Sequence, residues 1–233
     1  MMPLLATHKL ESFYGDFQAL FGIDFEIDRG EIVAVIGANG AGKSTFLKTV
    51  CGLLKAARDA IVFDGEPIGG MAPGKIVRRG IAMVPEGRRL FPSLSVEENL
   101  LMGAYAKRPG PWNLEAVYAL FPVLREKHRS PATALSGGQQ QMAAIGRALM
   151  SNPALLICDE ISLGLAPIVV KEIYEALPRI CTDGMTAIIV EQDVGLAQKM
   201  SARLYCLQEG KVTLTGASGK MTREQISEAY FGI

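Results

Sequence analysis

Cysteine is scarce in this chain, and the few cysteines that occur are far apart. Four are present among 233 residues, at positions 51, 158, 181 and 206. No two of them form a C-x-x-C pair, and this spacing argues against both a disulfide framework and a cysteine-ligated metal site. We therefore expect reduced, mostly buried thiols, as in a cytosolic protein.

Long apolar runs and an excess of one charge are also missing. No apolar run approaches the ~20 residues that span a bilayer, and residues 1–10 lack the basic and apolar segments of a secretory signal. Lys plus Arg and Asp plus Glu each number 24, so the net charge gives no reason to expect nucleic-acid binding. A transport role would therefore require separate membrane-embedded partners.

The hydrophobic residues, 49 % of the chain, are sufficient for one large domain. Residues 21–27 alternate between apolar and polar side chains, which predicts a half-exposed antiparallel strand. Near-continuous apolar runs predict strands buried on both faces at 31–36, 154–158 and 187–190. We also predict a strand at 61–63 and a hairpin at 204–215. Helices are expected at 43–51 and 167–180, with several short helices over about 90–151. Strands alternating with helices indicate an α/β fold with a mainly parallel central sheet.

A glycine-rich segment lies between the predicted strand 31–36 and the helix that follows it. It fits the pattern G-x-x-x-x-G-K-[ST], whose backbone N–H groups and helix N-terminus favour a bound phosphate. Lys43 would reach the β- and γ-phosphates, and the Ser44 hydroxyl would ligate Mg²⁺. The alternative is an ordinary glycine-rich turn. The nucleotide-binding residues that we expect here are Gly37, Asn39, Gly40, Ala41, Gly42, Lys43, Ser44 and Thr45.

Two carboxylates, Asp159 and Glu160, end the predicted strand 154–158. In phosphate-loop ATPases, the aspartate at this place holds Mg²⁺ through its water shell. Glu160 would then accept a proton from the attacking water. Acidic residues also commonly mark the ends of strands, and it is the phosphate loop that favours the metal site.

The pentapeptide at 135–139, Leu-Ser-Gly-Gly-Gln, resembles the LSGGQ signature of ABC-family ATPases. Ser136, Gly137, Gly138 and Gln139 can present a hydroxyl and bare N–H groups at the start of a helix, which we expect to begin near Gln139. The resemblance covers essentially the whole chain. It implies a phosphate-loop (P-loop) NTPase fold in a single domain, 1–233, with an antiparallel β subdomain and a helical signature subdomain inserted at about 90–151.

The same resemblance implies an arrangement of two subunits. The signature of one ATPase subunit completes the ATP site of a second one, which is either identical or different. Tyr14 matches the aromatic residue that stacks on adenine; the alternative is a tyrosine of the core or of an edge strand.

Three residues depart from the usual pattern of the family. Glu86 stands where the family usually has a glutamine, and we count it among the metal ligands with Ser44 and Asp159. Gln192 replaces a histidine near the γ-phosphate; it can donate an amide hydrogen bond but cannot become cationic. Ile161 replaces the proline that usually follows the glutamate and could alter the tilt of Glu160. We interpret the site as catalysing hydrolysis without a titrating histidine; the alternative is a weakly hydrolysing regulatory module.

One branch of the family is particularly similar, through residues 84–89, 140–153 and 162–167. It is the shorter ATPase subunit, the LivF type, of branched-chain amino acid importers. This resemblance implies ATP and Mg²⁺ as cofactors, transmembrane permease subunits contacted near Glu86 to Leu94, a periplasmic or extracellular solute-binding protein acting indirectly, and a peripheral location on the cytoplasmic face of the membrane. It implies no nucleic acid. The alternatives are an importer of urea or short amides, a lipid or lipopolysaccharide exporter, and an ATPase acting on DNA or ribosomes.

Overall fold

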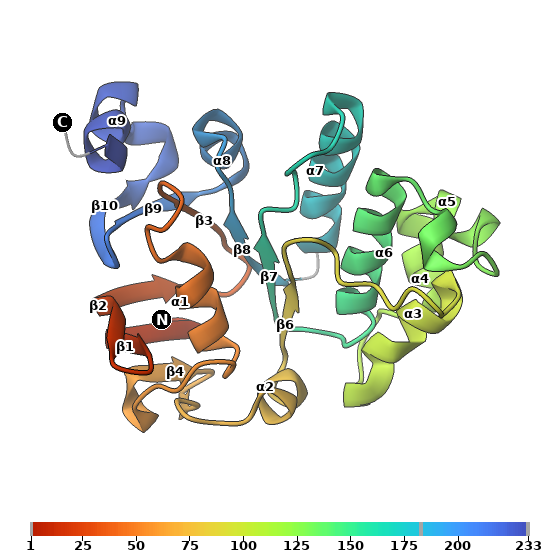
Figure 1. Cartoon of the computed structure of the whole chain (residues 1–233), viewed down its shortest axis with the longest axis horizontal. Coiled ribbons are helices and arrows are strands. Elements are labelled where there is room, and N and C mark those ends of the chain that lie inside the picture. Colours follow the sequence, from red (N-terminus) through yellow and green to blue (C-terminus); the bar gives the residue numbers. More distant parts are fainter. Residues whose placement is uncertain (1, 182–183, 232–233) are drawn as a thin grey trace. The chain divides into compact units, whose positions relative to one another are not determined.

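The structure is a computed structural model that describes residues 2–181 and 184–231 (Figure 1). It contains two compact units. The first comprises the chain up to Ile76 and again from Thr186, and the second comprises Val77–Met185. In the described part of the chain, each helix is too short or too polar to span a membrane. The expected single domain over 1–233 stays a prediction.

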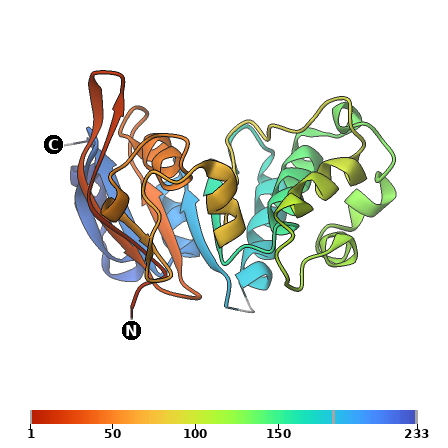
Figure 2. The same ribbon diagram turned by 90° about the horizontal axis from the view of Figure 1, so that it is seen from below.

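The first unit contains an antiparallel sheet whose strands lie in the order β2-β1-β4-β5. These strands are β1 (Leu5–Tyr14), β2 (Phe17–Ile27), β4 (Ile61–Phe63) and β5 (Glu66–Pro67). The hairpin of β1 and β2 forms a long ribbon, visible in Figure 2. β2 begins four residues before the predicted strand, and the sequence analysis did not identify β1. A register irregularity opposite Leu10 interrupts the expected alternation, so that Leu20 is buried and Phe21 exposed.

The second set of strands in this unit is mainly parallel, as predicted. Its order is β10-β9-β3-β8, and β3 runs parallel to both β8 and β9. The strands are β3 (Ile32–Ile36), β8 (Thr186–Val190), β9 (Arg203–Gln208) and β10 (Lys211–Ala217). β9 and β10 form the predicted hairpin, which turns at Glu209 and Gly210 with φ angles of 47° and 73°.

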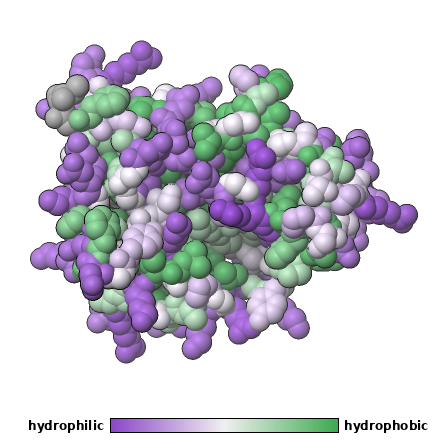
Figure 3. All heavy atoms as spheres, in the orientation of Figure 1, coloured by the Kyte–Doolittle hydropathy of each residue, from purple (hydrophilic) through white to green (hydrophobic). Residues whose placement is uncertain are grey.

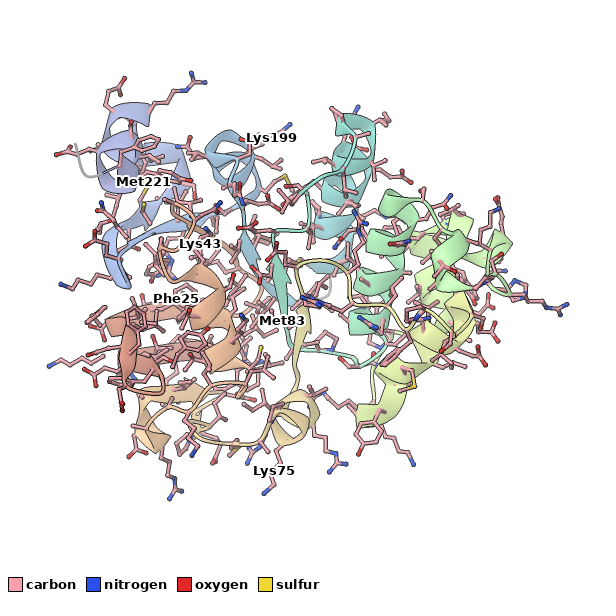
Figure 4. All side chains as sticks on the ribbon, viewed as in Figure 1. Phe25, Lys43, Lys75, Met83, Lys199 and Met221 are labelled. Carbon is pink, nitrogen blue, oxygen red and sulfur yellow. The ribbon has the colours of Figure 1, made fainter. Side chains whose placement is uncertain are left out.

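Helix α1 (Lys43–Val50) packs against β1 and β2. The ring of Phe25, labelled in Figure 4, lies 5.1 Å from that of Phe46 in α1 and 4.5 Å from that of Tyr205 in β9. These aromatic contacts join the helix to both groups of strands. Helices α8 (Val194–Met200) and α9 (Arg223–Phe231) pack on β3 and β9, and short 3-10 turns occupy Arg58–Ala60 and Ser218–Lys220.

The second unit holds two parallel strands, β6 (Ile81–Val84) and β7 (Leu155–Asp159), and most of the helices. Its centre is α6 (Gly137–Leu149), which packs against β6, α3, α5 and α7. The surrounding helices are α3 (Val96–Gly103), α4 (Leu114–Leu120), α5 (Pro122–Glu126) and α7 (Pro167–Cys181), with 3-10 turns at Ala104–Ala106 and Ala132–Ala134. The boundary between the units falls within α2 (Pro73–Arg79). The helices α3 to α6 confirm the short helices predicted over about 90–151.

Burial agrees with the expectations from composition. Cys158 and Cys206 are buried, and Cys51 and Cys181 are half-buried. Burial raises the pKa of the Cys181 thiol to about 11, so the thiol form dominates near neutral pH. Hydrophilic and hydrophobic side chains are interspersed on the face shown in Figure 3.

Candidate functional site

The glycine-rich loop connects β3 directly to α1 in the first unit. Gly42 is the N-cap of α1 at φ 104°, and as a glycine it has no side chain that could cap the helix. Gly37, at φ 149°, lies so close to β9 that a Cβ atom there would be 2.3 Å from the carbonyl oxygen of Leu207. Only glycine fits this position. The loop thus leads directly into a helix N-terminus, which is an anion-binding arrangement.

Lys43 folds back over this loop. Its side chain is only 4 % exposed, and Nζ donates hydrogen bonds to the carbonyl oxygens of Gly37 and Ala38 at 2.7 and 3.1 Å. Figure 4 shows Lys43 at the beginning of α1. A buried ammonium group needs such acceptors, because burying an unpaired charge is costly. The positive charge is therefore fixed at the loop that the sequence predicts to hold phosphates.

Two other predicted residues of the first unit lie next to the loop or its helix. The Tyr14 hydroxyl is 3.4 Å from Oγ1 of Thr45, and the tyrosine is 45 % exposed at the end of β1. Nε2 of Gln192 donates to Oδ1 of Asn39 at 3.4 Å. The structure therefore brings Tyr14 next to the first turn of α1 and Gln192 next to the loop, although both lie far from them in sequence. No sequence pattern predicted that Tyr14 would contact Thr45 or that Gln192 would contact Asn39.

In the second unit, the signature pentapeptide caps α6. The Ser136 hydroxyl accepts a hydrogen bond from the Gln139 N–H at 3.3 Å, and the Gln139 side chain accepts one from the Ser136 N–H at 3.0 Å. This reciprocal capping box starts the helix at Gly137, so the expectation of a start near Gln139 was wrong by two residues. Gly138 is buried in the first turn, where a Cβ atom would lie 2.4 Å from the Val169 side chain.

The acidic pair ends β7, as expected. Asp159 is its last residue and is 3 % exposed, and Glu160 is half-buried. Glu160 has a φ angle of 48°, a left-handed conformation that costs about 1–3 kcal/mol in a non-glycine residue. Proline at position 161 would bias Glu160 toward an extended conformation. Ile161, which is buried, leaves the left-handed conformation accessible.

Glu86 follows the carboxyl end of β6, at the same edge of the strand pair as Asp159 and Glu160. Val84 of β6 pairs with Cys158 of β7 in parallel register, and Glu86 and Glu160 each follow two residues later. Glu86 is exposed. Parallel strands direct their carboxyl ends to one edge, so the local topology agrees with placing these acids at a common site.

The expected metal ligands are divided between the units. Ser44 belongs to the first, whereas Glu86 and Asp159 belong to the second. All three offer the hard oxygen donors that Mg²⁺ prefers. In residues 2–181 and 184–231, no group of three or more His, Cys, Asp or Glu side chains could hold a metal ion.

Arg88 is a residue that the sequence analysis did not single out. Its Nη1 lies 3.4 Å from Oε1 of Gln140, and a Cβ atom on Gly137 would be 3.1 Å from its Nη2. The guanidinium group thus lies against the first turn of α6. No periodicity could have revealed a contact between residues 52 positions apart.

Comparisons with known proteins agree with this geometry. Residues 20–162 match a family described as ABC transporter. The chain is 45 % identical to the high-affinity branched-chain amino acid transport ATP-binding protein BraG of Pseudomonas aeruginosa, over 98 % of this chain and 100 % of that protein. It is 33 % identical to the probable branched-chain amino acid transport ATP-binding protein LivF of Archaeoglobus fulgidus, over 99 % of both chains. The crystal structure of a nucleotide-free ATP-binding cassette from an ABC transporter superposes with a TM-score of 0.82 at 27 % identity, over 98 % of this chain and 95 % of the other.

Proposed function

Because this chain belongs to the ABC transporter family, we propose that it is the ATP-binding and ATP-hydrolysing subunit of an importer that energises uptake of branched-chain amino acids. The observation that carries this proposal is the 45 % identity to BraG over nearly the full length of both chains. The fold, a P-loop ATPase cassette, supports the same conclusion. The glycine-rich loop at the N-terminus of α1, with the buried Lys43, supplies the matching chemistry.

In this proposal, ATP binds to the loop of the first unit. The loop N–H groups and Lys43 hold the phosphates, and Tyr14 stacks on the adenine. Gln192 donates an amide hydrogen bond to the γ-phosphate; since it cannot titrate, its contribution does not depend on pH near neutrality. The residues that bind nucleotide are Tyr14, Gly37, Asn39, Gly40, Ala41, Gly42, Lys43, Ser44, Thr45, Ser136, Gly137, Gly138 and Gln139.

Hydrolysis depends mainly on positioning and charge stabilisation. Glu160 accepts the proton of the attacking water, while Lys43 stabilises negative charge on the transferred phosphoryl group. Ser44, Asp159 and Glu86 hold Mg²⁺, which neutralises charge on the phosphate oxygens when it is bound. The left-handed backbone at Glu160 sets the direction in which its side chain leaves the end of β7.

The proposal also defines the partners. Residues Ser136 to Gln139 complete the ATP site of a second ATPase subunit, identical or different. Closure of the two ATPase subunits moves the helical subdomains, and the segment Glu86 to Leu94 transmits this movement to transmembrane permease subunits. A periplasmic or extracellular solute-binding protein delivers the amino acid to the permease subunits. The chain therefore acts on the cytoplasmic face of the membrane, without nucleic acid.

The first experiment is purification of the tagged chain from membranes of its native cells in mild detergent, followed by mass spectrometry. We expect two permease subunits and a second, different ATPase. Recovery with ribosomes or nucleic acid and no membrane protein would refute the transport function.

Uptake of labelled leucine and urea, compared in cells carrying wild type or Glu160→Gln, tests the solute: only leucine uptake should fall. Loss of urea uptake alone would assign the chain to the urea and short-amide branch.

A weakly hydrolysing regulatory module is the second candidate, favoured by the departures at Glu86 and Gln192. A steady-state ATPase assay of the purified complex separates the two candidates. Hydrolysis stimulated by the loaded solute-binding protein supports the importer subunit, whereas nucleotide binding with no stimulated turnover supports the regulatory module.

A further inference from the structure

The loop after Glu86 has an unusual backbone. Gly87, Arg88 and Arg89 have φ angles of 73°, 66° and 48°, so three consecutive residues adopt positive φ. Two of them are not glycine, and such residues keep this conformation only where surrounding groups hold it. The segment therefore needs external support.

Arg147, in the last turn of α6, supplies that support. Its Nη2 donates to the carbonyl oxygen of Arg88 at 3.0 Å, and its Nη1 donates to that of Arg89 at 2.7 Å. The guanidinium carbon lies 5.6 Å from the centre of the Phe91 ring. One planar fork thus satisfies the carbonyl groups of both left-handed arginines, which the single point charge of lysine cannot do in the same geometry. Burial lowers the pKa of Arg147, in keeping with a partly desolvated charge.

A second connection leads from the loop to the other end of the same helix. Nη1 of Arg88 lies 3.4 Å from Oε1 of Gln140, and Nε2 of Gln140 donates to the carbonyl oxygen of Leu135 at 3.1 Å. Leu135 directly precedes Ser136. The contacts therefore run from the last turn of α6, through the loop, to the residue before the helix cap.

We propose that Arg147 is a positioning residue that fixes the loop 86–89 to α6, so that Glu86 and the signature pentapeptide are held as one rigid body. The roles of Glu86 and of the pentapeptide rest on the proposed function. The attachment of the loop to the helix rests only on the contacts within the second unit.

The test compares Arg147→Met and Arg147→Lys with a matched pair, Arg108→Met and Arg108→Lys. Arg108 also donates to two backbone carbonyl groups of this unit, those of Asn152 at 3.1 Å and Arg78 at 2.9 Å. Arg78 precedes β6 and Asn152 precedes β7, whereas the loop 86–89 directly follows β6. Hydrogen–deuterium exchange reports on amides 86–91, and the Mg²⁺ dependence of ATP hydrolysis reports on Glu86.

We expect Arg147→Met to accelerate exchange of amides 86–91 by about tenfold or more, because two charge-assisted hydrogen bonds are lost. Arg147→Lys should fall between Arg147→Met and wild type. The Mg²⁺ concentration for half-maximal hydrolysis should rise about three- to tenfold, with Mg²⁺-free ATP affinity unchanged. The Arg108 variants should change neither quantity.

Unchanged exchange in the loop of Arg147→Met would overturn the proposal, as would equal acceleration in the Arg108 variants. Should Arg147→Met fail to fold, Arg147→Lys decides by the same measurements. If the wild-type complex hydrolyses no ATP, the proposed function fails, while the exchange data still decide whether Arg147 holds the loop.

Discussion

Single residues in this protein hold uncommon backbone conformations. Glu160 is left-handed at φ 48°, and Gly37 occupies a space that no side chain could share. The strain at Glu160 is of the order of 1–3 kcal/mol and persists only because the surrounding fold determines it. The buried Ile161 is part of that surrounding. Strain of this kind gathers at functional sites, which supports the role proposed for Glu160.

At this scale, Glu160→Gln tests the general base. The amide cannot accept the proton of the attacking water, so hydrolysis should fall about 10²- to 10⁴-fold while ATP binding persists. Steady-state hydrolysis and equilibrium binding of a fluorescent ATP analogue measure the two effects. Glu172→Gln, at an exposed position of α7, is the control and should behave as wild type. Hydrolysis by Glu160→Gln at the wild-type rate would show that another group is the base.

Two helices of the second unit start in the same way. Ser95 with Glu98 caps α3, and Ser136 with Gln139 caps α6, each through a reciprocal capping box. The two caps share the same reciprocal hydrogen-bond pattern, with Glu98 in one and Gln139 in the other, but only the second belongs to the signature. They therefore offer a matched pair for separating stability from function.

We expect Ser95→Ala and Ser136→Ala each to lower the free energy of unfolding by about 1 kcal/mol, because each removes one N-cap acceptor. Only Ser136→Ala should also reduce the rate of ATP hydrolysis. Urea titration and a steady-state assay on the same samples measure both quantities. Equal losses of activity in the two variants would mean that Ser136 acts through helix stability alone.

Helices α3 and α4 are joined by a hydrogen bond that depends on pH. The Tyr118 hydroxyl donates to Oε2 of Glu97 at 3.1 Å. Burial and this carboxylate raise the pKa of Tyr118 from 10.0 to about 12. The folded state therefore holds the proton more tightly than the unfolded chain, so the stabilisation is complete below pH 10 and is lost as the pH rises toward 12.

Tyr118→Phe should accordingly reduce the fall in the free energy of unfolding between pH 10 and 12. Urea titrations at several alkaline pH values measure this slope. Tyr105→Phe, at an exposed tyrosine of the same unit, serves as the control and should keep the wild-type slope. The same slope in Tyr118→Phe and wild type would exclude Tyr118 as its source.

On the scale of the whole molecule, the residues proposed for ATP hydrolysis are distributed over both compact units. The loop, Tyr14 and Gln192 belong to one unit, and Asp159, Glu160 and the signature belong to the other. In the proposed assembly, the signature serves the ATP site of a second subunit. Catalysis should therefore depend on association as well as on folding.

We expect the ATPase activity per mole of chain to fall on dilution, because dissociation removes the signature from each site. Activity measured over a hundredfold range of concentration tests this, with circular dichroism as the control for folding. Addition of the second ATPase subunit should restore activity at low concentration. Activity per mole that stays constant over the whole range would indicate a site completed within one chain.

The sequence by itself determined the features that depend on neighbouring residues. The loop between a buried strand and a helix, the hairpin turning at Glu209 and Gly210, and the buried strands follow from local turn chemistry and periodicity. The start of α6 could also have been predicted from the sequence, because a serine three residues before a glutamine is the pattern of a capping box, as in Ser136 and Gln139.

Only the tertiary structure decided the features that depend on packing between distant segments. The irregularity that exposes Phe21 arises from pairing between β1 and β2. The contacts of Gln192 with Asn39 and of Arg147 with the loop at Arg88 join residues 153 and 59 positions apart. Such contacts form because folding brings polar groups of distant segments within hydrogen-bond distance of one another, and no local pattern encodes which partner that will be.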